Sequence, residues 1–507
     1  MTGKGFNLIT DPWIPVDGGP ISIEEALVNA HQIDGWPCSD PAFSEALMRL
    51  LVPMTYRITG MDDHDHELYR CEFADRQRRL LDEGRLDPEC VRSYLDQHRD
   101  RFWLVNPPAG HEPIAQDSAL SRIECPDKPA KAVFAWASTS SPSLGPHAAT
   151  DMIEPGIAAQ ALLTLRLFYG CGTVTGHPAT GKPRGNGKNP PLRNTTSLHP
   201  VGKNLAATLI AHMIPKPHDT VFGEAFWETE SVPGQIAPYA RRAGMLEQIA
   251  GRQDKTFYWH TTNGCITGFT LAAGRGTAPD LAIEDPYTLV RDDQSPIRPR
   301  EGREFWREAQ SLLLKSGDDQ YARVPILDWA RDGDSSAENY PPSEFGWVAF
   351  SHRGERSKPV ERASVCAHAP DLLGIFQPDA SRRCTTFLAL AADAERLMCD
   401  EVKSAFRKAG VITRKSKAEE IAEVRKPARS AYWHRAEADF WQVARDVVDD
   451  EHLGERLREH ALIGFDDATA HLMHERRSHL AVVESRRWIE RWRRQSNGST
   501  DRGDVTV

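Results

Sequence analysis

Residues 6–16 read Phe6-Asn-Leu-Ile-Thr-Asp11-Pro12-Trp13-Ile14-Pro15-Val16, and this stretch gives the chain its first recognisable structure. A short apolar run, a turn and a second apolar run predict two short strands. Gly18-Gly19 then predicts a hairpin-like break, and the residues from Ile23 onward have helical spacing. Prolines within an apolar run favour a position at a sheet edge. We therefore expect strands followed by a helix at the start of the chain.

The composition is typical of a globular protein that does not span a membrane. The chain has 507 residues, of which 40% are hydrophobic and 26% are charged, enough for two to four domains with a large core. It contains no apolar run of about 18 residues, and its first residues lack the apolar core of a signal peptide. The nine cysteines form no C-x-x-C pair, which favours reduced thiols in the cytoplasm and argues against structural zinc. The formal net charge of −10 implies that any contact with nucleic acid uses local basic patches.

A glycine-rich, basic segment lies between two expected helices, at 157–169 and 205–214. Residues 170–193, called the Gly/Lys loop below, hold six glycines, four prolines and four basic residues, and no acid occurs between Glu154 and Asp219. Glycines allow positive φ and prolines interrupt a regular ladder, so a long irregular loop is expected. Such loops are either mobile linkers or functional, and the charge favours contact with phosphate or a nucleic-acid groove. The candidate contact residues are Gly181, Lys182, Arg184, Gly185, Gly187 and Lys188.

One motif in this loop resembles a phosphate-binding P-loop. Gly176 to Lys182 fits G-x-x-x-x-G-K, but Pro183 stands where a P-loop needs Ser or Thr for magnesium. A P-loop also follows a buried strand, whereas the residues before this motif have helical spacing. Nucleotide hydrolysis is therefore not expected at this site.

The middle of the chain predicts antiparallel strands. Short apolar runs separated by turn signals cover 257–273, and a basic turn with Arg275 at its centre follows. Residues 346–350 and 359–365 predict a β-hairpin around the polar segment 351–358, called the hairpin tip below. The open alternatives for this tip are a solvated turn and a DNA contact. Its candidate residues are Arg353, Arg356, Ser357 and Lys358.

The last part of the chain changes to helical spacing. Apolar residues recur at three- and four-residue intervals from about 387 to 406, and Gly410 is expected to end this helix. Further helices are expected at about 419–448, with a kink or break at Pro427, and at 451–462 and 468–492. Four helices with short connections predict a bundle. We therefore predict an α+β protein, with a mixed α/β domain over 1–378, a C-terminal four-helix bundle over 379–495 and a disordered tail over 496–507.

Basic residues gather at two places on the predicted bundle, a helix junction near 407–417 and a group that surrounds Trp488 and Trp492. Such runs are commonly solvated faces, yet basic residues interleaved with aromatics also suit single-stranded nucleic acid. The candidates for this contact are Arg407, Lys408, Arg414, Lys415, Lys417, Arg486 and Arg487.

The N-terminal sequence NLITDPWIPV resembles the start of the CasA family, the large subunit of the type I-E CRISPR surveillance complex Cascade. Helical regions at 41–58 and 69–98, the Gly/Lys loop, a mixed middle and a helical C-terminal part follow in the order of that family. The resemblance implies a non-catalytic subunit without a cofactor. Such a subunit recognises the protospacer-adjacent motif in double-stranded DNA, helps to open the duplex for R-loop formation, holds the displaced strand and helps to recruit the helicase-nuclease. The other implied partners are the crRNA 5′ handle and the backbone, 5′-handle-binding and small subunits.

The resemblance also suggests roles for individual segments. The hairpin tip corresponds to a wedge that enters the duplex, and Arg356 stands where the family typically has Gln. Phe134-Ala135-Trp136 corresponds to a flexible Phe-Val-Asn loop, of which only the Phe matches. For Phe134 and Trp136 the alternatives are stacking on bases or a neighbouring subunit and anchoring of the loop to the core. Asp285-Pro286-Tyr287 resembles a family segment that we expect to be structural.

Two other functions stay open. A phosphate-handling or metal-dependent nuclease would use the Gly/Lys loop and the His64–Glu67 cluster, although such a tract at a helix start is also typical of solvated charge. A structural scaffold would tolerate removal of Lys182, Arg184 and Arg356 without a change in DNA binding. The sequence shows no Ser-His-Asp elbow and no dinucleotide fingerprint, so no active site is expected.

Overall fold

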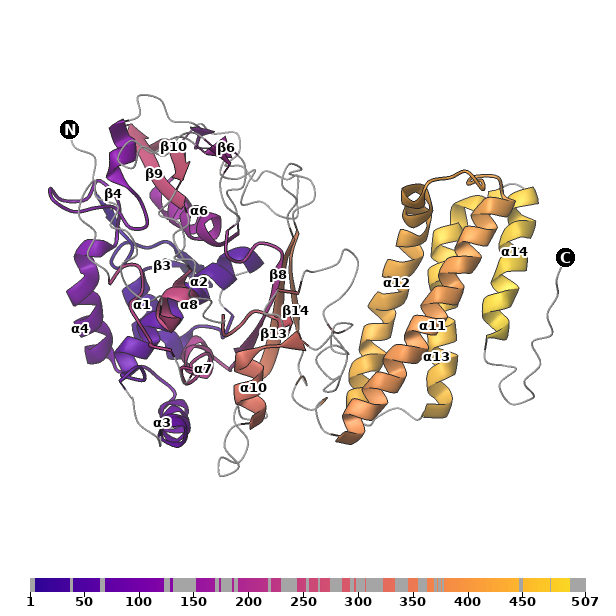
Figure 1. Ribbon diagram of the computed structural model, residues 1–507, viewed down its shortest axis with the longest axis horizontal. Coiled ribbons are helices and arrows are strands. Elements are labelled where there is room, and N and C mark those ends of the chain that lie inside the picture. The colour runs from indigo at the N-terminus through magenta and orange to yellow at the C-terminus, as the bar shows by residue number, and fades with distance from the viewer. Residues whose placement is uncertain are drawn as a thin grey trace. The chain divides into compact units, whose positions relative to one another are not determined.

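The computed structural model divides the chain into two compact units (Figure 1). The first comprises residues 1–299 and 322–370, and the second comprises 300–321 and 371–507. The sequence places the boundary at 378/379 and does not anticipate that 300–321 group with the second unit. The predicted tail at 496–507 lies outside the described residues. The structure describes residues 5–36, 40–63, 69–122, 128–130, 152–168, 173–174, 185–186, 190–217, 220–228, 244–251, 255–262, 265–273, 285–291, 296–297, 306, 322–332, 345–353, 363–368, 372, 375, 378–445, 450–474 and 476–492.

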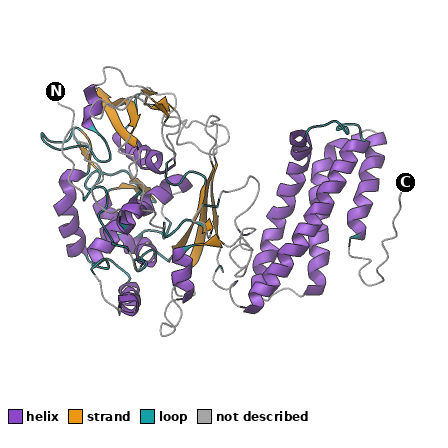
Figure 2. Ribbon diagram, in the orientation of Figure 1, coloured by secondary structure: helices purple, strands orange, loops and turns teal. Residues whose placement is uncertain are grey.

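The first unit combines helices with small sheets, whereas the described elements of the second unit are helices (Figure 2). The predicted α+β class is confirmed. The helices of the first unit are α1 (Ile23–Val28), α2 (Pro41–Thr59), α3 (Tyr69–Glu83), α4 (Pro88–His98), α6 (Pro155–Phe168), α7 (Leu205–Ala211), α8 (Met245–Ala250) and α10 (Pro325–Asp332), with 3-10 turns η1 (Ala30–Gln32), η2 (Arg99–Arg101) and η3 (Ser118–Arg122). None of the described helices is long and apolar enough to cross a membrane.

The described strands of the first unit pair only in antiparallel fashion. They are β1 (Phe6–Asn7), β2 (Ile14–Val16), β3 (Gly19–Ile21), β4 (Trp103–Val105), β5 (Lys128–Pro129), β6 (Thr173–Val174), β7 (Gly185–Asn186), β8 (Thr195–Val201), β9 (Lys255–Thr262), β10 (Cys265–Ala273), β11 (Val290–Arg291), β12 (Ala322–Arg323), β13 (Gly346–Arg353) and β14 (Ala363–His368). Two sheets have three strands, in the orders β5-β10-β9 and β14-β13-β8. The strands predicted over 257–273 and the hairpin predicted over 346–365 are therefore confirmed.

The N-terminal signature is a structural anchor. The Asn7 side chain donates to the carbonyl of Arg99 (2.9 Å) and accepts from the amide of Ile9 (3.0 Å). The indole of Trp13 is 1% exposed and donates to the carbonyl of Leu8 (2.9 Å), while Gln160 of α6 donates to the carbonyl of Trp13 (2.8 Å). Because buried polar groups must be paired, these contacts hold the first strands against α6 and the segment before β4.

Helix α2 lies at the centre of the first unit. Asp40 caps its N-terminus by accepting from the amides of Ala42 (2.9 Å) and Phe43 (3.1 Å), Pro41 occupies the first turn, and Gly60 ends the helix at φ 61°. The helix is buried on nearly all sides and packs against α4, α6, α7, α8, β13 and β14. A helix that is covered all round belongs to the core.

The second unit is a helical bundle. Its helices are α11 (Pro378–Lys408), α12 (Ala418–Ala444), α13 (Asp450–Thr469) and α14 (Arg476–Arg491), with the 3-10 turn η8 (Ala470–His474), and they pack on one another. Gly410 follows α11 at φ +82°, as expected for a helix stop, whereas α12 continues through Pro427 without a break. Gly464 allows close packing of α13 on α12, because a Cβ there would lie 2.8 Å from the carbonyl oxygen of Ala428.

Candidate nucleic-acid interface

The roots of the Gly/Lys loop and of the hairpin tip lie side by side at one end of the β14-β13-β8 sheet. Thr195, the first residue of β8 after the loop, pairs with His352. His352 is the residue before Arg353, where β13 ends. The hydroxyls of Thr196 and Ser351 are 3.1 Å apart in the next pair. Since β13 and β14 are antiparallel and Arg353 pairs with Ala363, the two strands of the hairpin also meet at this end of the sheet. The fold thus brings together two segments that are about 150 residues apart in the chain.

Contacts with α6 close the Gly/Lys loop at its base. The amide of Leu192 donates to the carbonyl of Leu167 (3.0 Å), and the Leu192 carbonyl accepts from the Thr195 hydroxyl (2.9 Å). Phe168, the last residue of α6, packs against Phe350 and His352 of β13 at centroid distances of 5.3 and 5.0 Å. The end of α6 therefore contacts both the end of the Gly/Lys loop, through Leu167, and the hairpin root, through Phe168.

The prediction of an irregular Gly/Lys loop needs one correction. Thr173 pairs with Asn186 and Val174 with Gly185, so β6 and β7 form a short antiparallel ladder inside the loop. The prolines that were expected to prevent a ladder lie outside these four positions and do not remove their amides. Of the predicted contact residues only Gly185 is described, and Gly181, Lys182, Arg184, Gly187 and Lys188 lie outside the described residues. At the hairpin tip Arg353 ends β13, and Arg356, Ser357 and Lys358 lie outside them as well.

The segment with the predicted aromatic contacts begins and ends on β10. The amide of Ala130 donates to the carbonyl of Thr267 (3.0 Å), and Ile153 forms an isolated bridge with Ile266. Phe134 and Trp136 themselves lie outside the described residues, as does Arg275. Arg275 follows the opposite end of β10, because Ala273 lies roughly 20 Å along the strand from Thr267 at about 3.3 Å per residue. The last described residue before Arg275 is therefore well separated along β10 from the base of the aromatic segment.

The predicted cations of the second unit divide into paired and unpaired side chains. Arg486 donates to Asp466 (2.9 and 3.0 Å) and pairs with Glu490. Lys408 pairs with Glu484 (3.1 Å). The remaining predicted cations are exposed and have no acidic partner within the described part of the bundle. These unpaired cations are Arg407, Arg414, Lys415, Lys417 and Arg487. An unpaired guanidinium or ammonium is available to a phosphate, so this second group is the better candidate for contact with nucleic acid.

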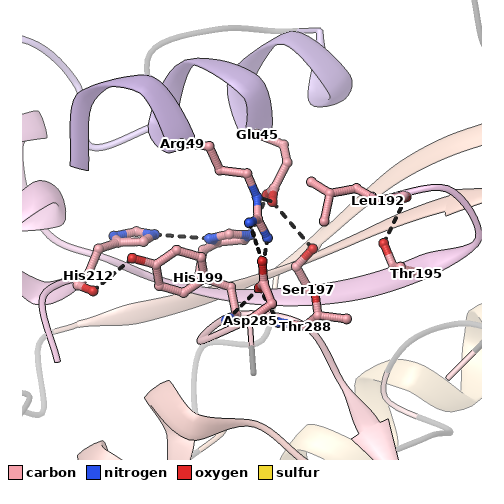
Figure 3. Close-up of polar contacts among 10 residues, drawn as sticks. Glu45, Arg49, Leu192, Thr195, Ser197, His199, His212, Asp285 and Thr288 are labelled. Carbon is pink, nitrogen blue, oxygen red and sulfur yellow. Dashed lines mark hydrogen bonds and ion pairs between the residues drawn. The ribbon is translucent and has the colours of Figure 1, made fainter. Parts of the chain in front are cut away.

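A buried network of charged side chains lies against β8, and the sequence patterns did not reveal it (Figure 3). Arg49 of α2 is 1% exposed, donates to both oxygens of Asp285 (2.5 and 3.1 Å) and contacts Glu45 through Nε (2.5 Å). Glu45 forms an ion pair with His199 of β8, and His199 Nδ1 lies 3.0 Å from His212 Nε2. The network therefore connects α2 to β8 and to the residue after α7.

Asp285 and Tyr287 extend this network. Asp285 accepts from the backbone amides of Tyr287 and Thr288 (3.0 Å each), and the Tyr287 hydroxyl donates to the His212 carbonyl (3.0 Å). The amide of Leu198 in β8 donates to the Tyr287 carbonyl (2.8 Å). The expectation that the Asp-Pro-Tyr segment is structural agrees with these contacts, and the segment lies along the edge of β8 that β13 leaves open.

The hydrogen bonds determine the proton positions on the two histidines. His212 Nδ1 lies 2.7 Å from the Thr208 carbonyl, which only accepts, so Nδ1 carries a proton. Neutral His212 then accepts at Nε2 from His199 Nδ1. The remaining His199 nitrogen, Nε2, faces the Glu45 carboxylate. The Arg49 guanidinium pairs with both buried carboxylates, those of Glu45 and Asp285, as a buried charge requires.

The same contacts shift the pKa values of the group. Burial alone raises the pKa of Glu45, but the charges of His199 and then Arg49 lower it to about 2. Burial, followed by the charge of His199, lowers the pKa of His212 to about 3. Burial also raises the pKa of Tyr287. Glu45 therefore stays ionised, and His212 and Tyr287 stay neutral, at neutral pH.

Sequence comparison assigns this fold to a family. Residues 7–472 match the family described as CRISPR-associated protein Cse1. The chain belongs to this Cse1 family. The CasA family resemblance of the N-terminal sequence is thereby confirmed.

Known relatives agree with this assignment. The chain is 28% identical over 339 residues to CRISPR-associated protein CasA/Cse1 of Thermus thermophilus, a match that covers 62% of this chain and 61% of the relative. Two similar solved structures are Thermobifida fusca Cse1 (TM-score 0.68, 20% identity, 96% of this chain and 98% of that one) and a chain of a CRISPR RNA-guided surveillance complex (TM-score 0.73, 21% identity, 96% and 99%). At these identities the structures establish the shared fold.

In this Cse1-family chain the network and the loop roots lie on one face of the sheet. Residues directly opposite in an antiparallel pair point to the same face, and that face repeats every second residue. Ser197 and His199 contact Glu45 of α2, and Thr195 lies on the same face two residues closer to the loop. The network therefore holds β8 at the point from which the Gly/Lys loop leaves it.

The sequence of this Cse1-family chain contains a pattern that could have indicated the Glu45–Arg49 part of the network. Glu45 and Arg49 form an i,i+4 pair inside the run from Phe43 to Met54, whose other residues are apolar except for Ser44. Such a pair usually lies on a solvated helix face, but here most of the neighbouring residues are apolar. His199 and Asp285 lie far away in the chain and show no spacing pattern that would have joined them to α2.

The nuclease alternative depends on residues that the structure does not describe. His64–Glu67 lies outside the described residues. Within the described ranges, no group of three or more His, Cys, Asp or Glu side chains is placed to hold a metal ion.

We expect the stability of the first unit to fall in mild acid because of His212. Its folded pKa lies below the unfolded value of about 6.5, so the stabilisation is present above that pH and is lost as the pH falls towards 3. One such group contributes up to about 1.4 kcal/mol per pH unit. Urea unfolding at pH 7.0 and 5.5 should therefore show a smaller pH dependence for His212→Gln than for the wild-type chain. The exposed His111→Gln variant is the control, and an undiminished dependence in His212→Gln would contradict the assignment.

Proposed function

We propose that this chain is the large, non-catalytic subunit of a CRISPR RNA-guided surveillance complex. In this proposal it reads the base pairs that flank the target in double-stranded DNA and starts strand separation. Its bundle holds the displaced strand and helps to recruit a helicase-nuclease. The family match and the similarity of the fold to a chain of a CRISPR RNA-guided surveillance complex support membership in such a complex.

The observation that carries the proposal is the pairing of Thr195 with His352. It means that the Gly/Lys loop and the hairpin tip emerge from one sheet end, so one duplex can meet both. Glycines allow the loop backbone to approach a groove closely, and Lys182, Arg184 and Lys188 supply charge for phosphates. The minor groove presents a degenerate pattern, so several related flanking sequences should be accepted.

An acidic chain suits this task because it does not need to supply most of the specificity. Pairing with the guide RNA reads the target sequence, and the protein checks a few base pairs. The net charge of −10 disfavours binding to arbitrary DNA and leaves contact to the local basic segments. In the second unit, the unpaired cations Arg407, Arg414, Lys415, Lys417 and Arg487 form the proposed contact with the displaced strand.

Replacing Arg356 by Ala should impair strand opening more than initial docking. A planar guanidinium at the hairpin tip can stack against a base pair and hold phosphate, and this contact forms only when the tip enters the duplex. Opening is measured by 2-aminopurine fluorescence beside the flanking motif, and docking by a gel shift with a target that cannot pair with the guide. Arg92→Ala, on α4 of the same unit, is the control. An equal loss in both steps would argue against a wedge.

The nuclease alternative makes a separate prediction. The purified chain would cleave single- or double-stranded DNA with Mg²⁺ or Mn²⁺, and chelation would stop the cleavage. Under the proposed function the chain leaves both substrates intact in either condition. Metal-dependent cleavage that is lost on replacing His64 and His66 would favour the alternative.

A further inference from the structure

Helix α14 separates its residues into a buried and an exposed face. The buried face consists of Ser478, Ala481, Val482, Ser485 and Ile489. At 3.6 residues per turn, seven of the eight exposed residues of α14 gather on the other side, within about a third of the circumference, and His479 lies apart from them. They are Arg476, Arg477, Leu480, Glu484, Arg487, Trp488 and Arg491. The helix thus presents a narrow basic strip that also holds two large apolar side chains.

Trp488 is unusually exposed for a large apolar side chain. It is 57% exposed and Leu480 is 58% exposed, the highest values among the large apolar side chains that the structure describes. The inner face of α14 already supplies its packing against the bundle. The indole therefore leaves a broad aromatic face in water, where it contributes nothing to the core.

The charges around Trp488 are not neutralised within the described part of the bundle. The Arg491 guanidinium lies 6.0 Å from the Trp488 ring centroid, and Arg487 and Arg491 have no acidic partner there. The one acid of the strip, Glu484, pairs with Lys408 of α11 (3.1 Å). Arg486 lies outside the strip and forms ion pairs with Asp466 and Glu490. The two arginines beside the indole, Arg487 and Arg491, are therefore the ones without an acidic partner in the described bundle.

An exposed indole between free arginines is the arrangement that binds single-stranded nucleic acid. Every base has a π-face that stacks on an aromatic side chain, and the arginines hold the neighbouring phosphates. An acidic protein surface would suit the arginines but leave the indole unmatched. We propose that Trp488 stacks on a base of the displaced strand. This inference rests on the proposed function of the bundle and names the residue that engages a base.

The Lys408–Glu484 pair connects this strip to the rest of the proposed contact. It places the end of α11 beside the middle of α14, and Arg414, Lys415 and Lys417 follow α11 directly. The two basic groups of the bundle are therefore neighbours. A strand can pass from one to the other without leaving the second unit.

The test compares two probes with the full-length chain at low salt. One is a fluorescently labelled oligo-dT, and the other is an oligonucleotide of the same length that carries abasic sites. Trp488→Ala should lose about tenfold in affinity for oligo-dT and nothing for the abasic probe, and Trp488→Phe should regain most of the loss. Leu480→Ala, on the same strip, is the matched control and should bind oligo-dT as the wild-type chain does.

The arginines should act differently from the indole. Arg487→Gln with Arg491→Gln should weaken both probes and reduce the slope of log affinity against log salt by about 0.7 per lost contact, whereas Trp488→Ala should leave that slope unchanged. If Trp488→Ala loses the same affinity for both probes, or loses none, base stacking by Trp488 is wrong. It is also wrong if the wild-type chain does not bind oligo-dT. A Trp488→Ala chain that binds oligo-dT normally but no longer joins the complex would assign the strip to a protein partner. Dependence on flanking base pairs is measured separately, so either proposal can fail alone.

Discussion

Arg49→Met should destabilise the first unit by about 3–5 kcal/mol, since it leaves buried carboxylates without a counter-charge. Arg49 is 1% exposed, and both Glu45 and Asp285 depend on it. The loss should appear as an earlier urea transition and as faster hydrogen exchange in peptides from α2 and β8. Because β8 leads directly from the Gly/Lys loop, target binding by the assembled complex should weaken as well.

Arg92→Met is the matched control for this substitution. Arg92 is a 54% exposed side chain that pairs with Glu24 at 3.3 Å, and exposed pairs contribute about 0–1 kcal/mol. Removing the buried charges together, as Glu45→Gln, Arg49→Met and Asp285→Asn, should recover part of the loss, because no unbalanced carboxylate is left. A cost for Arg49→Met as small as that of Arg92→Met would contradict the buried network.

Neutralising Lys182, Arg184 and Lys188 together to Gln should weaken target binding by on the order of 100-fold near 0.15 M salt if all three contact phosphate. Each lost contact should also flatten the log–log salt dependence by up to about one unit. The measurement is a salt titration of target affinity for the complex assembled with the variant chain.

Overall charge requires its own control in this experiment. Arg79, Arg85 and Arg92 are exposed residues of α3, of the α3–α4 turn and of α4 in the first unit. Replacing these three by Gln changes the net charge by the same amount, from −10 to −13, and should leave the salt slope near that of the wild-type complex. If both triple variants behave alike, the Gly/Lys loop is not a DNA contact.

Local patterns in the sequence predicted most of the secondary structure because each element has its own chemistry. The sequence shows the spacing and turn residues that are typical of each class of element. Examples are α11 with its stop at Gly410, the strands around Phe257–Ala273 and the hairpin after Gly346. The effect of Pro427 was harder to predict from the sequence, because α12 continues through this proline. Packing against α11 and α13 outweighs the loss of one helical hydrogen bond there.

Long-range relations were beyond the sequence patterns. The pairing of Thr195 with His352 and the Arg49–Asp285 ion pair join residues far apart in the chain, and no local spacing encodes such contacts. Charge runs also looked alike in the sequence, yet the structure finds Arg486 paired and Arg487 unpaired. The candidate residues at the loop tips, including Lys182 and Arg356, stay predictions.

The most direct test of the account is a gel shift with the guide-RNA complex assembled with and without this chain. The targets are matched duplexes that differ only in the few base pairs flanking the target sequence. We expect binding to require the chain and to depend on those flanking pairs. If the chain is dispensable, or if the flanking pairs make no difference, the proposed recognition function is wrong.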